Sequence, residues 1–380
     1  MSWSLRVIAL AGLILIWAQP AHPHQMLLPV NTSQTVTLDP PQQVQTNDPR
    51  VCVHTRLIDE VQEYKIQETL RLVRKMGAST IVDLFPWAYV ERNEGSYDWS
   101  RTDLIVKHAE NQGLRVIARL GLVPLWAQQS ADESIVTTLN YLPEERFGDF
   151  ADYVGAFAER YRGRVDHLII WNEPNLNFEW GGRPPDPDAY TRLLALAYEA
   201  AHAANPDVIV LGGALAPTLA APGGAQGGWN DLDFLREMYE AGAGAYFDGL
   251  AVHNYPFEAP PNTPPDPEEL NFRRIELWRA IMVEYGDAQK PVYITETGWN
   301  DHPRFVYGVS PRQRINYTLE AYDFTQEAYP WLETICLWQF RLPAPTNSYP
   351  DYFTLVSTEF QVKPIYTAIQ RYASGWEETE

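Results

Sequence analysis

The feature that most restricts the fold is an alternation that begins near residue 50. Eight short apolar runs, each typical of a buried strand, alternate with longer segments whose apolar residues recur with the period of a helix. The runs cover residues 51–54, 80–85, 115–120, 167–172, 208–212, 249–253, 292–295 and 334–340. The helical segments cover 60–76, 101–112, 144–162, 187–204, 231–241, 267–285, 311–328 and 362–373. Because strand–helix alternation implies a parallel sheet, eight units in residues 50–376 predict an α/β fold, a single closed (β/α)8 TIM barrel.

Helix-end signals support several of these segments. Ser310 precedes Pro311 and Gln313, which predicts an N-cap, a first-turn proline and a capping box. Asp186 and Pro187 repeat the first two signals. Glycines at the expected helix ends predict where four helices stop; these are Gly77, Gly113, Gly163 and Gly286.

The first 49 residues do not share this alternation. Arg6 precedes an apolar block, 7–17, and the small residues Ala18 and Ala21 follow, which is the layout of a secretory signal. We therefore expect a signal peptide over 1–24 and a secreted, extracellular or cell-surface protein. The block is shorter than the roughly 20 apolar residues of a spanning helix, so an uncleaved N-terminal anchor is the less favoured alternative. Residues 25–49, rich in Pro, Gln and Thr, are expected to form a disordered linker.

Two cysteines, Cys52 and Cys336, lie in apolar strand-like runs. Cysteine is among the residues most often buried, and buried free thiols are the expected state. A bridge stays open as an alternative, because the first and last strands would be neighbours in a closed barrel. Two thiols exclude a disulfide-rich scaffold and a multi-thiolate metal site.

Composition restricts the partners. The formal charge of −20 argues against nucleic acids and anionic membranes, which require clustered Lys and Arg. Neutral polymers remain open, and 13 Trp and 21 Tyr are too many rings for the core alone. The sequence has no Gly-rich loop that opens into a helix to hold a phosphate and no convincing metal-ligand spacing, so we expect neither a cofactor nor a metal.

In such a barrel the site lies at the carboxyl ends of the strands. Two glutamates, Glu173 and Glu296, fall at the ends of the fourth and seventh runs, with amide, imidazole, phenol and indole groups at the ends of others. Two carboxylates at one mouth form the set that glycoside cleavage requires. The accompanying residues are Asn172 after the fourth run, His253, Asn254 and Tyr255 at the sixth, and Trp338 in the eighth.

Two motifs among these residues resemble a known group of enzymes. Residues 171–175, Trp-Asn-Glu-Pro-Asn, and 294–299, Ile-Thr-Glu-Thr-Gly-Trp, resemble clan A of the glycoside hydrolases, with families 39 and 5 the most similar. The segments 95–99 and 363–366 add weaker support, and the resemblance extends over residues 50–376. It implies that Glu173, after strand four, is the acid/base and that Glu296, after strand seven, is the nucleophile.

The resemblance also implies roles for four neighbours. Asn172 would hold the sugar 2-hydroxyl, Tyr255 would bond to the nucleophile, and Trp338 would form the floor of the subsite. His253 matches a frequent site histidine. Physically, the charge of Glu296 should raise the pKa of Glu173, while hydrogen bonds from Tyr255 and Asn172 should keep Glu296 ionised. Carboxyl groups about 5–5.5 Å apart would mean retention of configuration.

One position departs from the family pattern. Relatives often carry in strand two an arginine that supports the nucleophile, and Val82 stands there by alignment. Arg119, inside strand three, either supplies this charge or serves as a structural ion-pair partner. The expected function is a secreted retaining β-glycosidase that hydrolyses O-glycosidic bonds of an oligo- or polysaccharide by double displacement. A carbohydrate-binding pseudo-enzyme and a transglycosylase remain as alternatives, and the sequence leaves the sugar, the linkage and exo or endo action open.

Other side chains in loops after strands have two interpretations each. Glu179 and Glu258 either replace a catalytic glutamate or have no role, and His54 is a subsite residue or a core histidine. The Pro-rich segment 260–267 is either a wall of the cleft or a connector. Five indoles either stack on substrate or pack the loops. They are Trp87, Trp126, Trp180, Trp229 and Trp299, of which we expect Trp87, Trp126 and Trp299 to bind substrate.

Overall fold

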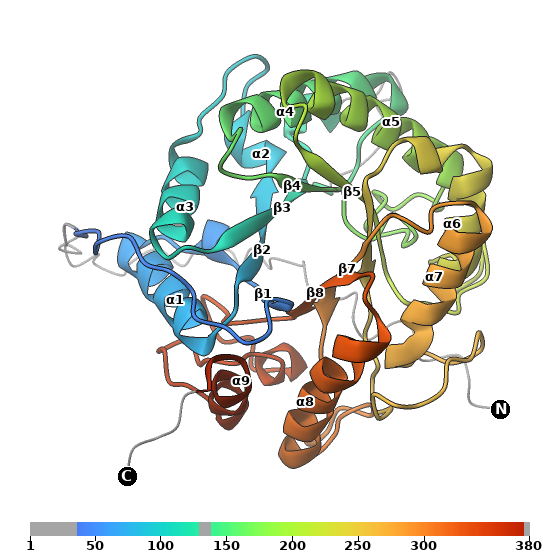
Figure 1. Cartoon of the computed structure of the whole chain (residues 1–380). Helices are drawn as coiled ribbons and strands as arrows, with labels where there is room; N and C mark the ends of the chain where they lie inside the picture. Colours follow the sequence, from blue (N-terminus) through green and yellow to red (C-terminus); the bar gives the residue numbers. More distant parts are fainter. Residues whose placement is uncertain (1–35, 129–137, 376–380) are drawn as a thin grey trace, which may run out of the picture.

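Eight parallel strands form a closed barrel in chain order, with the helices outside it (Figure 1). The computed structural model describes residues 36–128 and 138–375. The strands are β1 (Val51–His54), β2 (Thr80–Pro86), β3 (Arg115–Gly121), β4 (His167–Ile170), β5 (Ile209–Leu215), β6 (Gly249–His253), β7 (Val292–Thr297) and β8 (Leu332–Leu337). The predicted TIM barrel is therefore confirmed.

The helices follow the strands as the alternation predicts, with one short addition. They are α1 (Glu63–Met76), α2 (Trp87–Val90), α3 (Ser100–Asn111), α4 (Phe147–Arg160), α5 (Pro187–Ala204), α6 (Asp231–Glu240), α7 (Ile275–Glu284), α8 (Pro311–Ala328) and α9 (Pro364–Ser374). The short α2 was not predicted. Ser310 and Gln313 form the predicted capping box, and Asp186 caps α5 by accepting a bond from the Ala189 amide.

The sixth predicted helix, 267–285, which corresponds to α7, begins later than expected. Its first turn is a 3-10 turn, Phe272–Arg274, and residues 267–271 are not helical. The Arg274 guanidinium accounts for this, because it donates to the carbonyl oxygens of Pro267 (2.9 Å) and Glu269 (3.1 Å). Arg274 is itself buried against Asp231, 2.9 Å away. The segment after β6 is thus bound to a buried charge instead of forming a helix.

Side chains fill the barrel interior and leave no pore. The interior layer is a separate apolar cluster, distinct from the larger core between strands and helices. Its members are Cys52, Val82, Ile117, Ile169, Leu211, Ala214, Ala251, Tyr293 and Cys336. Because this layer closes the barrel below, polar groups at the strand ends above it lie over an apolar floor.

A disulfide joins Cys52 to Cys336. The expectation of free thiols is wrong, and the alternative of a bridge between the two cysteines is confirmed. Barrel closure pairs β1 with β8 in a register that sets these two residues side by side, with Cα atoms 4.1 Å apart.

The described part of the predicted linker lies on the barrel. The Gln42 amide donates to Asn111 O (2.7 Å), the Gln67 side chain donates to Thr37 O (2.9 Å), and Asn47 bonds to Ala373. These contacts place residues 36–49 along α1, α3 and α9. The predicted signal peptide and residues 25–35 lie outside the described residues. Within the described ranges, no helix is both long and apolar enough to cross a membrane.

We expect the double variant Cys52→Ala/Cys336→Ala to be less stable. The bridge closes a loop of 284 residues. Loss of a native disulfide removes about 2–5 kcal/mol from the free energy of unfolding. Denaturant unfolding without reductant measures the effect, and reductant should lower the parent to a similar midpoint. A parent midpoint unaffected by reductant would contradict a formed bridge.

Candidate active site

The chain leaves β4 in a strained conformation that presents Glu173. Trp171 and Glu173 have φ angles of 75° and 44°, in the left-handed region that side chains rarely adopt. Neighbouring strands hold this geometry, since the Trp171 amide donates to Leu120 O and the Glu173 amide donates to Ala214 O, both at 3.0 Å. Strain maintained by the surrounding fold is typical of functional positions.

Glu296 lies in β7 and is fixed by two donors. Arg119, from β3, places Nη1 2.6 Å from Oε1, and the Tyr255 hydroxyl donates to Oε2 at 2.8 Å. All three side chains are nearly buried. The predicted bond between Tyr255 and the second glutamate is therefore present in the structure.

His253 connects the two glutamates. Its Nδ1 is 2.7 Å from Glu173 Oε1 and 3.7 Å from Glu296 Oε2. One carboxylate oxygen of each glutamate and a ring nitrogen of His253 all lie within 4.8 Å of one another. The same spacing would suit a metal ion, which the sequence does not predict, but the guanidinium of Arg119 beside Glu296 repels a cation.

Glu296 is held in its ionised form. Burial alone would raise the pKa of its carboxyl, but the nearby imidazoles of His253 and His54, the Arg119 guanidinium and the bond from Tyr255 lower this pKa to about 2. The imidazole of His54 is 3.4 Å from Glu296 Oε1. Burial and the charge of Arg119 lower the pKa of His54 to about 3, so His54 is neutral near pH 7. Arg119 is consequently the permanent cation at this carboxylate.

Arg119 also accounts for the absence of the arginine that relatives often carry in strand two. Val82 is part of the apolar layer inside the barrel, so no charge stands at that position. The guanidinium on the adjacent strand contacts Glu296 directly and also donates from Nη1 to Asn172 Oδ1 at 2.7 Å. Of the two interpretations of Arg119, the structure supports the one that supplies charge to Glu296.

A second buried carboxyl, Glu179, lies behind Asn172. It accepts a bond from Asn140 Nδ2 at 2.9 Å and hydrogen-bonds to the Asn172 side chain. Burial and the nearby carboxyl of Glu173 raise the pKa of Glu179 to about 8, so it is neutral at pH 7. Glu179 therefore supports Asn172 as a neutral hydrogen-bond partner. The exposed Glu258, in the loop after β6, is not part of this network.

Two of the predicted substrate-binding indoles do not reach the cleft. Trp87 is fully buried and donates from Nε1 to Glu91, and Trp299 is only 2% exposed. Trp299 stacks on Phe272 and donates to Ala259 O, 2.9 Å away. Each ring is buried and has its N–H engaged by the protein. This corrects the expectation that they bind substrate.

Trp338 and Trp126 are half-buried and still accessible. Trp338 follows β8 and packs edge-on against Phe353 (5.3 Å between ring centres), which in turn contacts Tyr255. Trp338 thus lies close to the tyrosine that holds Glu296, as a subsite floor requires. Trp126 lies in the loop after β3, and its Nε1 donates to Glu91 O.

Comparisons with known proteins agree with this fold. A family model described as beta-galactosidase, glycoside hydrolase 42, matches residues 57–143. No curated protein matches in sequence. A family 39 glycoside hydrolase from Bacteroides cellulosilyticus WH2 superposes with a TM-score of 0.68 and 22% identity; the alignment covers 86% of this chain and 64% of that one.

Two further structures are similar. A monomeric beta-xylosidase from Caulobacter crescentus CB15 has a TM-score of 0.60 and 19% identity, over 86% of this chain and 69% of that chain. An exo-beta-1,4-mannosidase from an Opitutaceae bacterium, strain TAV5, has a TM-score of 0.57 and 17% identity, over 89% and 62%. The resemblance to glycoside hydrolases that the two glutamate motifs indicate is thus confirmed, and these likenesses show a shared barrel fold.

We expect the Glu179→Gln variant to become increasingly more stable than the parent protein as the pH rises. The ordinary pKa of the carboxyl is 4.5, and in the folded protein it is about 8. Between these values the unfolded chain ionises while the folded chain does not, so the parent loses stability with rising pH. Because Gln cannot ionise, the variant does not lose stability in this way. The difference in Tm between variant and parent should widen from pH 4.5 to pH 8, and a constant difference would contradict a buried neutral Glu179.

Proposed function

We propose that this protein is a retaining β-glycosidase that cleaves O-glycosidic bonds of oligo- or polysaccharides. The observation that carries the proposal is the pair of Glu173 and Glu296, whose carboxylate oxygens approach within 4.8 Å. Retaining enzymes space their carboxyl groups by about 5–5.5 Å, whereas inverting enzymes leave about 6.5–9.5 Å for a water molecule. This short distance between oxygens supports the retaining arrangement.

In the first step Glu296 attacks the anomeric carbon while Glu173 donates a proton to the leaving oxygen. The low pKa of Glu296 keeps the attacking carboxylate ionised, and Tyr255 orients one of its oxygens. The product is a glycosyl ester on Glu296. Asn172, held by Arg119, is placed to bond to the 2-hydroxyl, a contact that strengthens in the transition state.

In the second step Glu173, now ionised, removes a proton from water, which attacks the ester and releases the sugar with its original configuration. His253 Nδ1, 2.7 Å from Glu173, fixes this carboxyl in both steps. If another sugar replaced water, the same site would transfer the glycosyl group. The sugar itself is open: the names of the similar proteins suggest β-xylosides, β-mannosides and β-galactosides for testing.

We further propose that the protein is exported. The N-terminal pattern supports this, and so does the Cys52–Cys336 disulfide, because such bridges persist in oxidising compartments. Mass spectrometry of the mature protein after expression in its host would test it. Cleavage near residue 24 agrees with export, whereas an intact Met1 in a cytoplasmic fraction contradicts it.

We expect Glu173→Ala and Glu296→Ala to lose activity in different ways. Loss of the acid/base should slow hydrolysis of aryl β-glycosides by about 10²–10⁴-fold. Added azide should restore turnover of both variants, with a β-glycosyl azide from Glu173→Ala and an α-glycosyl azide from Glu296→Ala. Product anomers are read by NMR. Full activity in either folded variant, or exchanged anomers, would contradict the assigned roles.

Arg119→Met should raise the pKa of the nucleophile. Because Arg119 helps hold the pKa of Glu296 near 2, its loss should move the acidic limb of the kcat/KM profile to higher pH and lower the maximum. Arg119→Lys, which keeps the charge but loses the planar guanidinium, serves as the matched control and should shift the limb less. An unchanged acidic limb in Arg119→Met would show that Arg119 does not set this pKa.

A further inference from the structure

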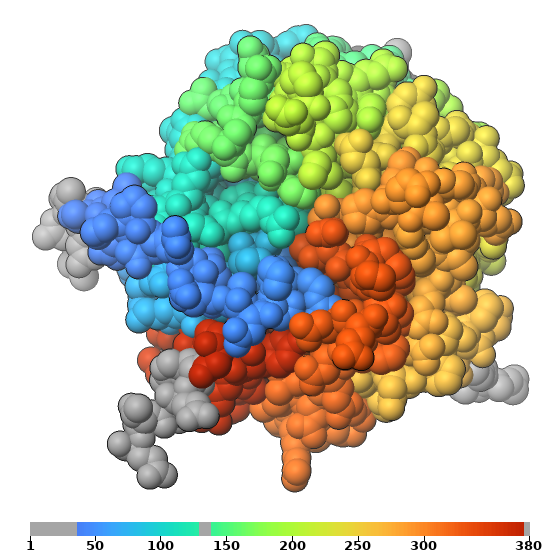
Figure 2. Space-filling model, in the orientation of Figure 1, coloured from blue at the N-terminus to red at the C-terminus, as the bar shows by residue number. Residues whose placement is uncertain are grey.

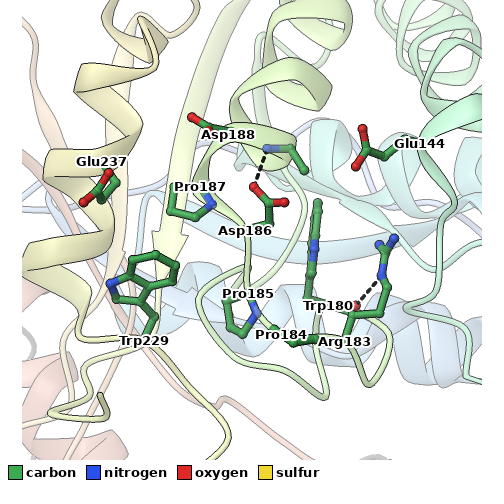
Figure 3. Close-up of a pocket in the computed structure, with 11 residues that line it drawn as sticks. Glu144, Trp180, Arg183, Pro184, Pro185, Asp186, Pro187, Asp188, Trp229 and Glu237 are labelled. Atoms are coloured by element: carbon green, nitrogen blue, oxygen red, sulfur yellow. Dashed lines mark hydrogen bonds between the residues drawn. The ribbon is translucent and has the colours of Figure 1, made fainter. Parts of the chain in front are cut away.

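A hollow of about 520 Å³ lies between the loop after β4, the beginning of α5 and helix α6 (Figure 3). The proposed reaction uses none of its residues. Two indoles, Trp180 and Trp229, stand at its sides, with a run of prolines between them. The lining is completed by Glu144, Arg183, Asp186, Asp188, Ala189 and Glu237.

The hollow is tied to the loop that carries the acid/base. Asn175, two residues after Glu173, exchanges two hydrogen bonds of 2.9 Å with the backbone of Ala216, in the loop after β5. The Trp229 amide donates to Asn175 O at 2.8 Å. These bonds fix Trp229 against the segment that presents Glu173. A ligand in the hollow would therefore rest on the loop of the acid/base.

The two indoles differ in their exposure. Trp180 is buried; its edge packs on Trp171, and the Arg183 guanidinium lies over its ring, 5.3 Å from the centre. Trp229 is half-buried and packs edge-on against Phe234, at 6.0 Å. Figure 3 shows its indole beside the prolines of the hollow. A flat ring beside an apolar floor suits the C–H face of a sugar.

The polar lining restricts the ligand further. Asp186 is engaged as the cap of α5, and Glu144 pairs with Arg192 at 2.6 Å. Asp188 and Glu237 are carboxylates suited to accept bonds from hydroxyl groups. Because four carboxylates line the hollow against one guanidinium, a polyanion is repelled and a neutral, hydroxyl-rich ligand is favoured.

We propose that this hollow is a second binding site for a neutral oligosaccharide, which stacks on Trp229 and bonds to Asp188 and Glu237. This inference rests on the proposed function for the identity of the ligand. A chain held there would be retained by the loop that also carries Glu173, so the site would favour polymers over small glycosides.

The test separates binding from turnover. In the Glu296→Gln background, calorimetric titration with xylo-, manno-, galacto- and gluco-oligosaccharides should show binding by at least one series. Adding Trp229→Ala should weaken that binding about tenfold, the loss expected for one stacking ring. The matched control is Trp331→Ala: Trp331 is also half-buried and stacked, on Tyr329, but it precedes β8 at the opposite end of the barrel, and its loss should leave the affinity unchanged.

In the active background, Trp229→Ala should lower kcat/KM on the polymer about tenfold and leave the rate on an aryl monoglycoside unchanged. Trp229→Phe should restore most of the loss. Asp188→Asn provides a second variant that leaves the indole in place, and it should also weaken oligosaccharide binding.

The possible failures are distinguishable. Equal affinities of Trp229→Ala and its parent, or no oligosaccharide binding at all, overturn the second site, while aryl glycoside hydrolysis by the wild type would still support the proposed function. Binding that depends on Trp229 without any hydrolysis would support the second site and overturn the proposed function.

Discussion

The contact between Arg119 and Glu296 is the interaction on which the proposed chemistry of this barrel depends. A carboxylate with so little exposure would ordinarily be protonated, because burial disfavours its charged form. The guanidinium 2.6 Å away, with the Tyr255 hydroxyl, reverses this preference. Such a pair is costly to break once buried, since either partner alone is an uncompensated charge. The pair forms only because barrel closure brings the upper ends of β3 and β7 to one mouth.

From this pair a continuous set of polar contacts extends across the mouth. Arg119 also holds Asn172, which contacts the neutral carboxyl of Glu179. On the other side His253 approaches both Glu173 and Glu296. Each glutamate is therefore placed by groups from other strands, so that the fold, and not the flexibility of a loop, determines their separation. The loop after β4 continues from Glu173 to Asn175, which joins the reaction site to the hollow at Trp229.

The sequence predicts most of the scaffold and the chemical pair, for identifiable reasons. Buried parallel strands appear as apolar runs, and helix ends appear as Ser310 or as glycine, so the order of the elements and the positions of Glu173 and Glu296 follow directly. The disulfide could not be decided, because it depends on the register between β1 and β8.

Other features also depend on three-dimensional contacts that no local pattern reports. The predicted loop positions of Trp87 and Trp299 did not reveal that both side chains are buried in the core. The sequence also did not reveal that Glu179 lies beside Asn172. The chain returns to Asn172 after a turn with strained backbone, six residues beyond Glu173. The late beginning of α7 reflects the bonds of buried Arg274 to Pro267 and Glu269 and its pairing with Asp231, which is distant in the sequence.

The most direct test of the central claim is the configuration of the first sugar released. Proton NMR, recorded during hydrolysis of whichever aryl β-glycoside the protein accepts, resolves the two anomers before they interconvert. With the carboxylate oxygens within 4.8 Å, the β-anomer should appear first and the α-anomer only later, by mutarotation. Initial release of the α-anomer would mean inversion and would contradict the assignment of Glu296 as nucleophile.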